Sequence, residues 1–233
     1  MKNVLLSLMA LGMLASCACS GLKVHYFNSK PKAEVSRQLK GFERIELLGS
    51  LDVKYEQADS FSVRVAAPVD VIKDVETRVE GNKLVVNMKG SNKFINVGVS
   101  DGDDVTVYVT SPDFLGISLM GSGDFLSARP LDTDTLTIEL RGSGDIHFND
   151  VICDQVSVSL IGSGDVSLDR VQTQWGQLDL IGSGDIDVFF DQSGEVNAQV
   201  KGSGDIEMKG TVRKMNKLVR GSGDIDTDEL MVR

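Results

Sequence analysis

Side chains that build metal centres and catalytic triads are scarce in this chain of 233 residues. It has two histidines, His25 and His147, which lie far apart in the sequence, and three cysteines. Zinc sites and histidine-based triads need several such residues held together, and three cysteines do not form a disulfide framework. Cys153 lies next to apolar positions and is expected to be a buried small hydrophobe. These scarcities argue against a zinc enzyme, a hydrolase triad and a disulfide scaffold.

Long apolar segments and an excess of positive charge are missing as well. The 34 acidic residues outnumber the 24 lysines and arginines, which gives a net charge of −10. An acidic chain repels nucleic acid and anionic membrane surfaces. The apolar core at the N-terminus is too short to span a bilayer, and no second apolar run is long enough to cross one. We therefore expect no nucleic-acid partner, and contact with a membrane only through a lipid anchor.

The N-terminal segment, 1–16, is typical of a bacterial export signal. Lys2 provides the positive charge, and residues 4–14 form a short apolar core. Residues 14–17 read Leu-Ala-Ser-Cys, which resembles a lipobox in which Cys17 becomes the lipidated first residue of the mature protein. Cys19 is a poorer acceptor, because a serine would then replace the aliphatic residue of the motif. An ordinary secretory signal is the alternative interpretation.

The predicted organisation is an anchor, a tether and one domain. Residues 17–40 lack clear periodicity and are expected to be a tether. Residues 41–233 show no sharp composition break, which predicts a single domain with a β-rich N-terminal part, 41–114, and a repeat part, 115–233. Within the first part, alternating residues predict strands, and residues 68–75 predict one short helix that begins with proline. We expect an outer membrane lipoprotein that faces the periplasm or the cell surface.

The tetrapeptide Gly-Ser-Gly-Asp recurs six times in the second half of the chain, at an almost constant interval. The copies begin at Gly121, Gly142, Gly162, Gly182, Gly202 and Gly221. A fixed period in this range is the sequence signature of stacked structural repeats. The interval therefore predicts one structural unit for every copy.

Residues on both sides of each copy alternate between apolar and polar. Two positions before the first glycine stand Leu119, Leu140, Leu160, Leu180, Val200 and Val219. A single copy cannot bury this apolar face, whereas rungs stacked about 4.8 Å apart bury it column by column. We therefore predict an all-β fold, a parallel β-solenoid with one rung for each copy of the tetrapeptide. An antiparallel sandwich or meander shows the same alternation and is the alternative.

The composition of the tetrapeptide suits a tight corner. Glycine permits positive φ and close approach of neighbouring backbones, and aspartate accepts hydrogen bonds from turn N–H groups. A second hypothesis is calcium, which prefers such hard oxygen ligands, although the spacing departs from the RTX nonapeptide. The candidate ligands form one column in a stack, namely Asp124, Asp145, Asp165, Asp185, Asp205 and Asp224.

These motifs resemble a known family. Residues 47–53 (Leu-Leu-Gly-Ser-Leu-Asp-Val), the lead from Pro112 into the first full copy, and the repeats followed by Ile or Val are similar to the auto-transporter adhesin head GIN domain family. The resemblance covers residues 41–233, with Leu51 in place of the second glycine, so that the turn there is expected to differ. It implies a β-rich, solenoid-like extracytoplasmic domain and brings no catalytic residues. A more distant likeness to toast-rack β-domains implies a scaffold or sensor.

Three functions remain open at this point. The first is a non-catalytic adhesion module that binds a protein or glycan at the cell envelope, with Ile161 and Ile181, flanked by Arg141 and Lys201, as an exposed contact patch. The second is an envelope scaffold or stress-sensing partner protein. The third is a polysaccharide-cleaving β-helix enzyme, which the even spread of acidic residues disfavours. We expect no enzymatic activity and, calcium apart, no cofactor.

Overall fold

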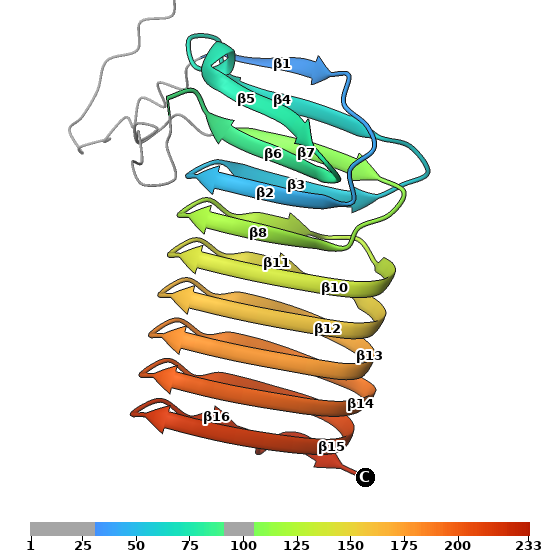
Figure 1. Cartoon of the computed structure of the whole chain (residues 1–233), viewed down its shortest axis with the longest axis vertical. Helices are drawn as coiled ribbons and strands as arrows, with labels where there is room; N and C mark the ends of the chain where they lie inside the picture. Colours follow the sequence, from blue (N-terminus) through green and yellow to red (C-terminus); the bar gives the residue numbers. More distant parts are fainter. Residues whose placement is uncertain (1–30, 91–104) are drawn as a thin grey trace, which may run out of the picture.

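The computed structural model describes residues 31–90 and 105–233, which form seventeen β-strands and one 3₁₀ turn. Cys17, the predicted signal sequence and most of the predicted tether lie outside the described residues. The strands are piled along the long axis of the molecule, with the C-terminus at the bottom of Figure 1. In the part of the chain that the structure describes, no helix is long and apolar enough to span a bilayer. The all-β prediction is confirmed.

The repeats form rungs in which a first strand leads into each Gly-Ser-Gly-Asp corner and a second strand leaves it. The first strands are β8 (Gly116–Gly121), β10 (Leu131–Gly142), β12 (Val151–Gly162) and the C-terminal parts of β13 (Val166–Gly182), β14 (Ile186–Gly202) and β15 (Ile206–Gly221). The second strands are β9 (Phe125–Ser127), β11 (Ile146–Phe148), the N-terminal parts of β13, β14 and β15, and β16 (Ile225–Asp226). Each long strand also bends partway along its length, and this bend is called the second corner. The last strand, β17 (Leu230–Val232), pairs with Gly210–Val212 at the second corner of β15.

Successive rungs pair in parallel, and their columns are in register. Leu140 lies opposite Leu160, Leu160 opposite Leu180, and Leu180 opposite Val200. All four are at most 1% exposed, so the apolar column predicted from the sequence is a continuous core. Bulges interrupt the register only where β13 and β14 turn the second corner. The parallel β-solenoid is confirmed, and the antiparallel alternative is wrong for the repeats.

The N-terminal part supplies one more rung of the same kind. β2 (Arg44–Gly49) pairs in parallel with β8, and β3 (Asp52–Gln57) pairs in parallel with β9. Beyond this rung lie β6 (Lys83–Met88) and β7 (Thr106–Ser111), which also pair with it in parallel. The chain therefore leaves the stack after β3, covers its upper end, and returns one rung below.

The degenerate corner at residues 49–52 stacks like the full copies. Gly49 lies opposite Gly121, with a φ of 103° against 135–149° for the first glycine of the six full copies. Leu51, in place of the second glycine, is fully buried. The turn thus differs as expected but keeps its place in the column.

The cap over this rung is antiparallel and corrects two details. β1 (Lys32–Arg37) pairs with β4 (Ser62–Pro68), β4 pairs with β7, and β5 (Val75–Glu80) pairs with β6. The predicted tether, 17–40, is therefore too long, because β1 belongs to the sheet and packs apolar residues on the core. The helix predicted over Pro68–Val75 is reduced to a 3₁₀ turn at Ile72–Asp74, since strands occupy both ends of that segment.

Aromatic rings fill the core where the cap meets the stack. The rings of Tyr55 and Phe114 stack with centroids 4.1 Å apart, and Phe125 and Phe148 continue the cluster at 5.2 Å. The Tyr55 hydroxyl lies 3.1 Å from Ser111 Oγ, and burial raises the pKa of Tyr55 to about 12. The rings pack on one another along the first rungs, and the contact between Tyr55 and Ser111 joins them to β7.

The corner glycines allow the backbones of consecutive rungs to touch. The Ser183 N–H donates to the carbonyl oxygen of Gly162 at 2.9 Å, and the same bond recurs at the other corners. A Cβ added to the second glycine of a corner, for example Gly164, would lie 2.0 Å from the oxygen of Gly144. No side chain fits in that space, so the corner requires glycine.

We predict that Gly164→Ala lowers the free energy of unfolding by about 3 kcal/mol or more, because the clash is with backbone that cannot move aside. Urea denaturation followed by circular dichroism measures it. The matched control is Ser163→Ala, which changes an exposed neighbour and is expected to stay within about 0.5 kcal/mol of wild type. Equal stability of the two variants would contradict the close-contact corner.

Candidate binding surface

The corner aspartates form one hydrogen-bonded ladder. The main-chain N–H of each donates to Oδ1 of the aspartate in the preceding rung, at 2.7–3.1 Å. The ladder runs from Asp52, the first acceptor, to Asp224, the last donor. Neighbouring carboxylates about 4.8 Å apart repel by roughly 0.9 kcal/mol in water, whereas a hydrogen bond to a charged group contributes about 1.5–3 kcal/mol. Main-chain donors therefore offset the repulsion along this edge.

The calcium hypothesis stays a prediction. All six candidate ligands are exposed in one column on the corner edge, Asp124, Asp145, Asp165, Asp185, Asp205 and Asp224. Among the described residues, however, no group of three or more His, Cys, Asp or Glu side chains is placed to hold a metal ion. The inter-rung hydrogen bonds explain the column without a ligand.

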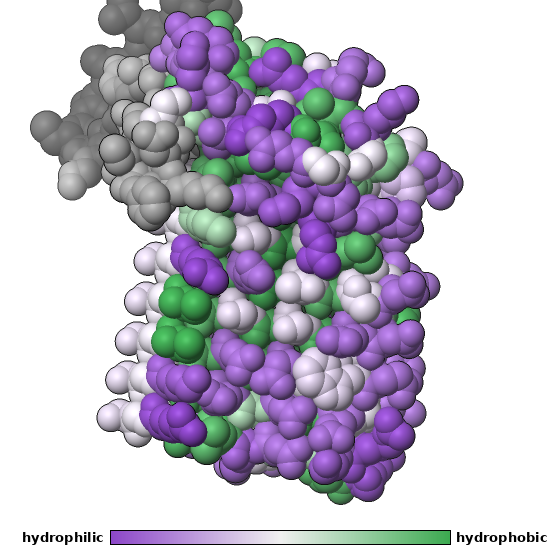
Figure 2. All heavy atoms as spheres, in the orientation of Figure 1, coloured by the Kyte–Doolittle hydropathy of each residue, from purple (hydrophilic) through white to green (hydrophobic). Residues whose placement is uncertain are grey.

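The predicted contact patch is assembled on the face of the first strands. Arg141 lies opposite Ile161, Ile161 opposite Ile181, and Ile181 opposite Lys201. The two isoleucines are 36% and 42% exposed, although both are large apolar side chains. Figure 2 shows hydrophobic surface near the corner edge, over β12 and β13, with hydrophilic residues above and below it. Register thus brings together four residues that are widely spaced in the sequence.

A shallow groove of about 420 Å³ lies on the other side of the corner edge, along the upper rungs. The corner aspartates form one wall, and the outward residues of the second strands, including Lys54, Leu126 and His147, line the rest. His147 Nε2 lies 2.8 Å from Asn149 Oδ1 and 3.1 Å from Asp169 Oδ2. The sequence did not predict this groove, because the lining residues share no common type.

Further down the same side, the outward column becomes acidic with Asp187 and Glu207, which lie opposite each other. Partial burial raises the pKa of Asp187 above its ordinary value, and repulsion from Glu207 and Asp185 adds to this, while Lys209 opposes it. The Asp187 carboxylate is therefore less favourable in the folded state than in the unfolded chain. The negative charge of Asp187 thus opposes folding.

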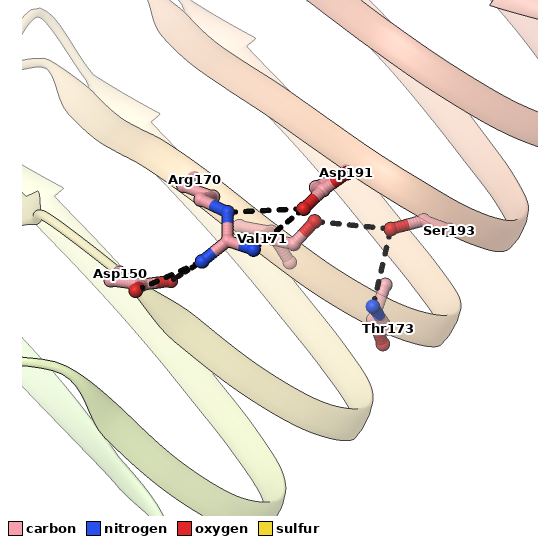
Figure 3. Close-up of polar contacts among 6 residues, drawn as sticks. All are labelled: Asp150, Arg170, Val171, Thr173, Asp191 and Ser193. Carbon is pink, nitrogen blue, oxygen red and sulfur yellow. Dashed lines mark hydrogen bonds and ion pairs between the residues drawn. The ribbon is translucent and has the colours of Figure 1, made fainter.

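Polar contacts fasten the second corner of the lower rungs. In Figure 3, the Arg170 guanidinium forms ion pairs with Asp150 at 3.2 Å and with Asp191 at 2.6 Å, and these two aspartates belong to the rungs on either side of Arg170. The buried Ser193 Oγ donates to the Val171 carbonyl oxygen and accepts the Thr173 N–H, both at 3.1 Å. These contacts join three rungs and occupy the groups involved, so they have a structural role.

The arrangement favours binding over catalysis. Cys153 is the buried small side chain predicted, and burial raises the pKa of its thiol, so it holds little thiolate. The partners of His147 are the Asn149 amide and the Asp169 carboxylate, so the hydroxyl or thiol of a triad is not among them. What the described residues offer is an extended surface of parallel columns, with an apolar pair on one side and a groove on the other.

A family model described as "Putative auto-transporter adhesin, head GIN domain" matches residues 41–177 and 167–233. No curated protein matches the chain.

Several solved structures share the fold. A putative adhesin from Bacteroides fragilis is 22% identical, with a TM-score of 0.64 over 84% of this chain and 97% of that one. A protein from Parabacteroides distasonis, described as a putative lipid binding protein, is 20% identical, with a TM-score of 0.67 over 88% and 98%. A putative adhesin from Parabacteroides merdae is 18% identical, with a TM-score of 0.57 over 88% and 98%. At these identities the likeness concerns the fold alone.

We predict that a calcium chelator leaves the melting temperature unchanged, because main-chain N–H groups satisfy the corner carboxylates. Differential scanning calorimetry with and without EDTA, followed by excess calcium, checks this. A melting temperature that falls with EDTA and returns with calcium would instead establish the metal hypothesis.

We predict that Asp187→Asn raises the melting temperature at pH 7, since it removes a carboxylate whose pKa is raised by folding. A raised pKa makes the folded state bind the proton more tightly, so stability falls as pH rises through that pKa. The gain over wild type should therefore shrink as pH is lowered and vanish below the ordinary aspartate value. Asp134→Asn removes an exposed charge elsewhere and serves as the control. A gain that does not depend on pH would rule out this cause.

Proposed function

The chain belongs to the auto-transporter adhesin head GIN domain family, and from this membership we propose that it is a non-catalytic adhesion module of the bacterial cell envelope. Its ligand is a protein or glycan that lies flat against the first strands. A solenoid presents equivalent side chains at regular intervals along one face, which suits an extended partner. The adhesin description of the family and the extended repetitive face of the fold support this proposal.

The exposed pair Ile161 and Ile181 is the observation that carries the proposal. In the same outward column, the neighbouring rungs carry Arg141 and Lys201, so the apolar pair is bounded by positive charge. Large apolar side chains that lie adjacent and exposed, with a polar rim, are typical of contact sites. In an acidic chain, this surface attracts a partner with an apolar centre and negative or hydroxyl-rich margins.

We place the module at the outer membrane, held by a lipid on Cys17. The lipobox-like run before Cys17 supports this position. The cap strands lie at the end of the stack where the described chain begins, and the last rung lies at the opposite end. In this proposal the lipid is attached on the N-terminal side of the cap strands. Protease treatment of intact cells distinguishes a module that faces the cell surface from one that faces the periplasm, since only a surface-exposed chain is degraded.

Two other functions compete with adhesion. An envelope scaffold or stress-sensing protein would use the same surface for a periplasmic partner, and protection from protease on intact cells favours it. A polysaccharide-cleaving enzyme would release reducing or unsaturated ends from acidic polysaccharides, which a direct assay detects. Where the described rungs break the repeat, at Asp150, Arg170 and Asp191, both carboxylates are held in ion pairs with Arg170, whereas such an enzyme requires carboxylates placed to act on the substrate.

We predict that the double variant Ile161→Ser, Ile181→Ser binds about tenfold more weakly than wild type, because it removes the apolar centre of the contact. The labelled full chain is applied to arrays of envelope polysaccharides and extracellular-matrix proteins, and affinity is measured for each member that wild type binds.

The control is Ile152→Ser, which changes an isoleucine that is 41% exposed on the same strand but outside the patch. It is expected to bind like wild type. Equal affinity of the double variant and wild type, or an equal loss in the control, would contradict the patch.

A further inference from the structure

The last rung leaves one long strand edge uncovered. On its upper side, β15 pairs with β14 along almost its whole length. On its lower side, β16 pairs with Ile206–Glu207, and β17 pairs with Gly210–Val212. Among the described residues, no strand pairs with the lower side of residues 213–221. Alternate N–H and C=O groups along this stretch are therefore available to a further strand.

Apolar side chains are exposed along this edge. Val219 is 37% exposed, although the residue above it in the same column, Val200, is fully buried. Leu218, next in the chain, is 44% exposed. A further rung would bury the Val219 side of the column as every rung above does. The edge thus carries an apolar side chain of the core column that no further rung covers.

The same edge has an unusual charge. Residues 208–223 contain five cations and no acidic residue, in a chain with a net charge of −10. The cations are Lys209, Arg213, Lys214, Lys217 and Arg220. Two of them are paired within the fold, Lys209 with Glu207 at 2.8 Å and Lys214 with Glu195 at 3.0 Å. Arg220 has no ion-pair partner among the described residues, and it is exposed.

We propose that residues 213–221 bind an acidic, extended segment of a partner protein, which adds a strand to the end of the solenoid. The main chain would supply hydrogen bonds, Leu218 and Val219 an apolar contact, and Arg220 the preference for carboxylates. Lys217 Nζ donates to the Ile225 carbonyl oxygen at 3.2 Å and Arg213 to Gln174 Oε1 at 3.4 Å, so these two cations add positive charge rather than a direct contact. Strand addition of this kind derives affinity from the main chain and specificity from alternate side chains. The site adjoins the patch, because Lys201 lies opposite Arg220, but it shares no residue with the patch, and different variants test the two sites.

A second copy of the chain fits this edge poorly. If two such edges paired antiparallel about Lys217, Lys214 would face Arg220, and like charges directly opposite are destabilising. The C-terminal strands of a second copy are also too short to cover the whole edge, because β16 has only two residues and β17 only three. The charge of the edge therefore disfavours pairing with the same edge of a second copy.

The test uses a fluorescein-labelled peptide of alternating glutamate and valine, as long as the uncovered edge, with the purified full chain. Fluorescence anisotropy measures affinity, and a peptide with lysine in place of glutamate is the comparison. We expect the acidic peptide to bind, the basic peptide not to bind, and affinity to fall as salt is raised. Amide hydrogen exchange should show new protection confined to residues 213–221.

A matched pair of variants locates the site. Arg220→Glu is expected to weaken the acidic peptide about tenfold, whereas Lys73→Glu, which reverses an exposed charge in the 3₁₀ turn of the cap, outside both surfaces, should have no effect. Equal binding of the two peptides, protection outside residues 213–221, or equal loss in both variants would overturn the proposal. So would a dimer in light scattering that the acidic peptide does not dissociate, since the edge would then belong to a second copy.

Discussion

The stack depends on the contact between backbones at each corner. Ser183 N–H reaches the Gly162 oxygen at 2.9 Å, and a Cβ at Gly164 would lie 2.0 Å from the Gly144 oxygen. This close contact fixes the register of the rungs at the six full copies, because only glycine fits it there. Once the register is fixed, the apolar residues on both sides of the corner align in buried columns.

Fixed inward columns leave the outward positions free to vary. At the corner, these positions hold aspartates whose carboxylates accept hydrogen bonds from main-chain N–H groups of the next rung. These bonds offset the repulsion between neighbouring carboxylates. The column before each corner uses it differently, and places Ile161 beside Ile181 between two cations. A surface of this kind acquires a binding site by changing a few side chains, without any change in fold. The proposed adhesion therefore rests on columns rather than on a cleft.

The sequence predicted the repeats well, because the period of the corners and the alternation around them carry the same information as the register. It predicted the N-terminal part less well. The pairing of β2 and β3 with β8 and β9 joins segments that lie far apart in the chain, and no local pattern encodes such a contact. The strand at Lys32–Arg37 falls within the predicted tether because a single edge strand carries little periodicity. The groove and the uncovered edge of β15 were missed because both depend on which residues the stack leaves without a neighbour.

The central claim is that the Gly-Ser-Gly-Asp corner is a structural joint between rungs. Scalar couplings across hydrogen bonds, measured by NMR on the labelled chain without added metal, test it most directly. The account predicts couplings from the Ser183 amide to the Gly162 carbonyl carbon and from the Asp185 amide to the carboxylate carbon of Asp165, in the preceding rung. Absence of both couplings in the folded protein, or couplings to other partners, would contradict it.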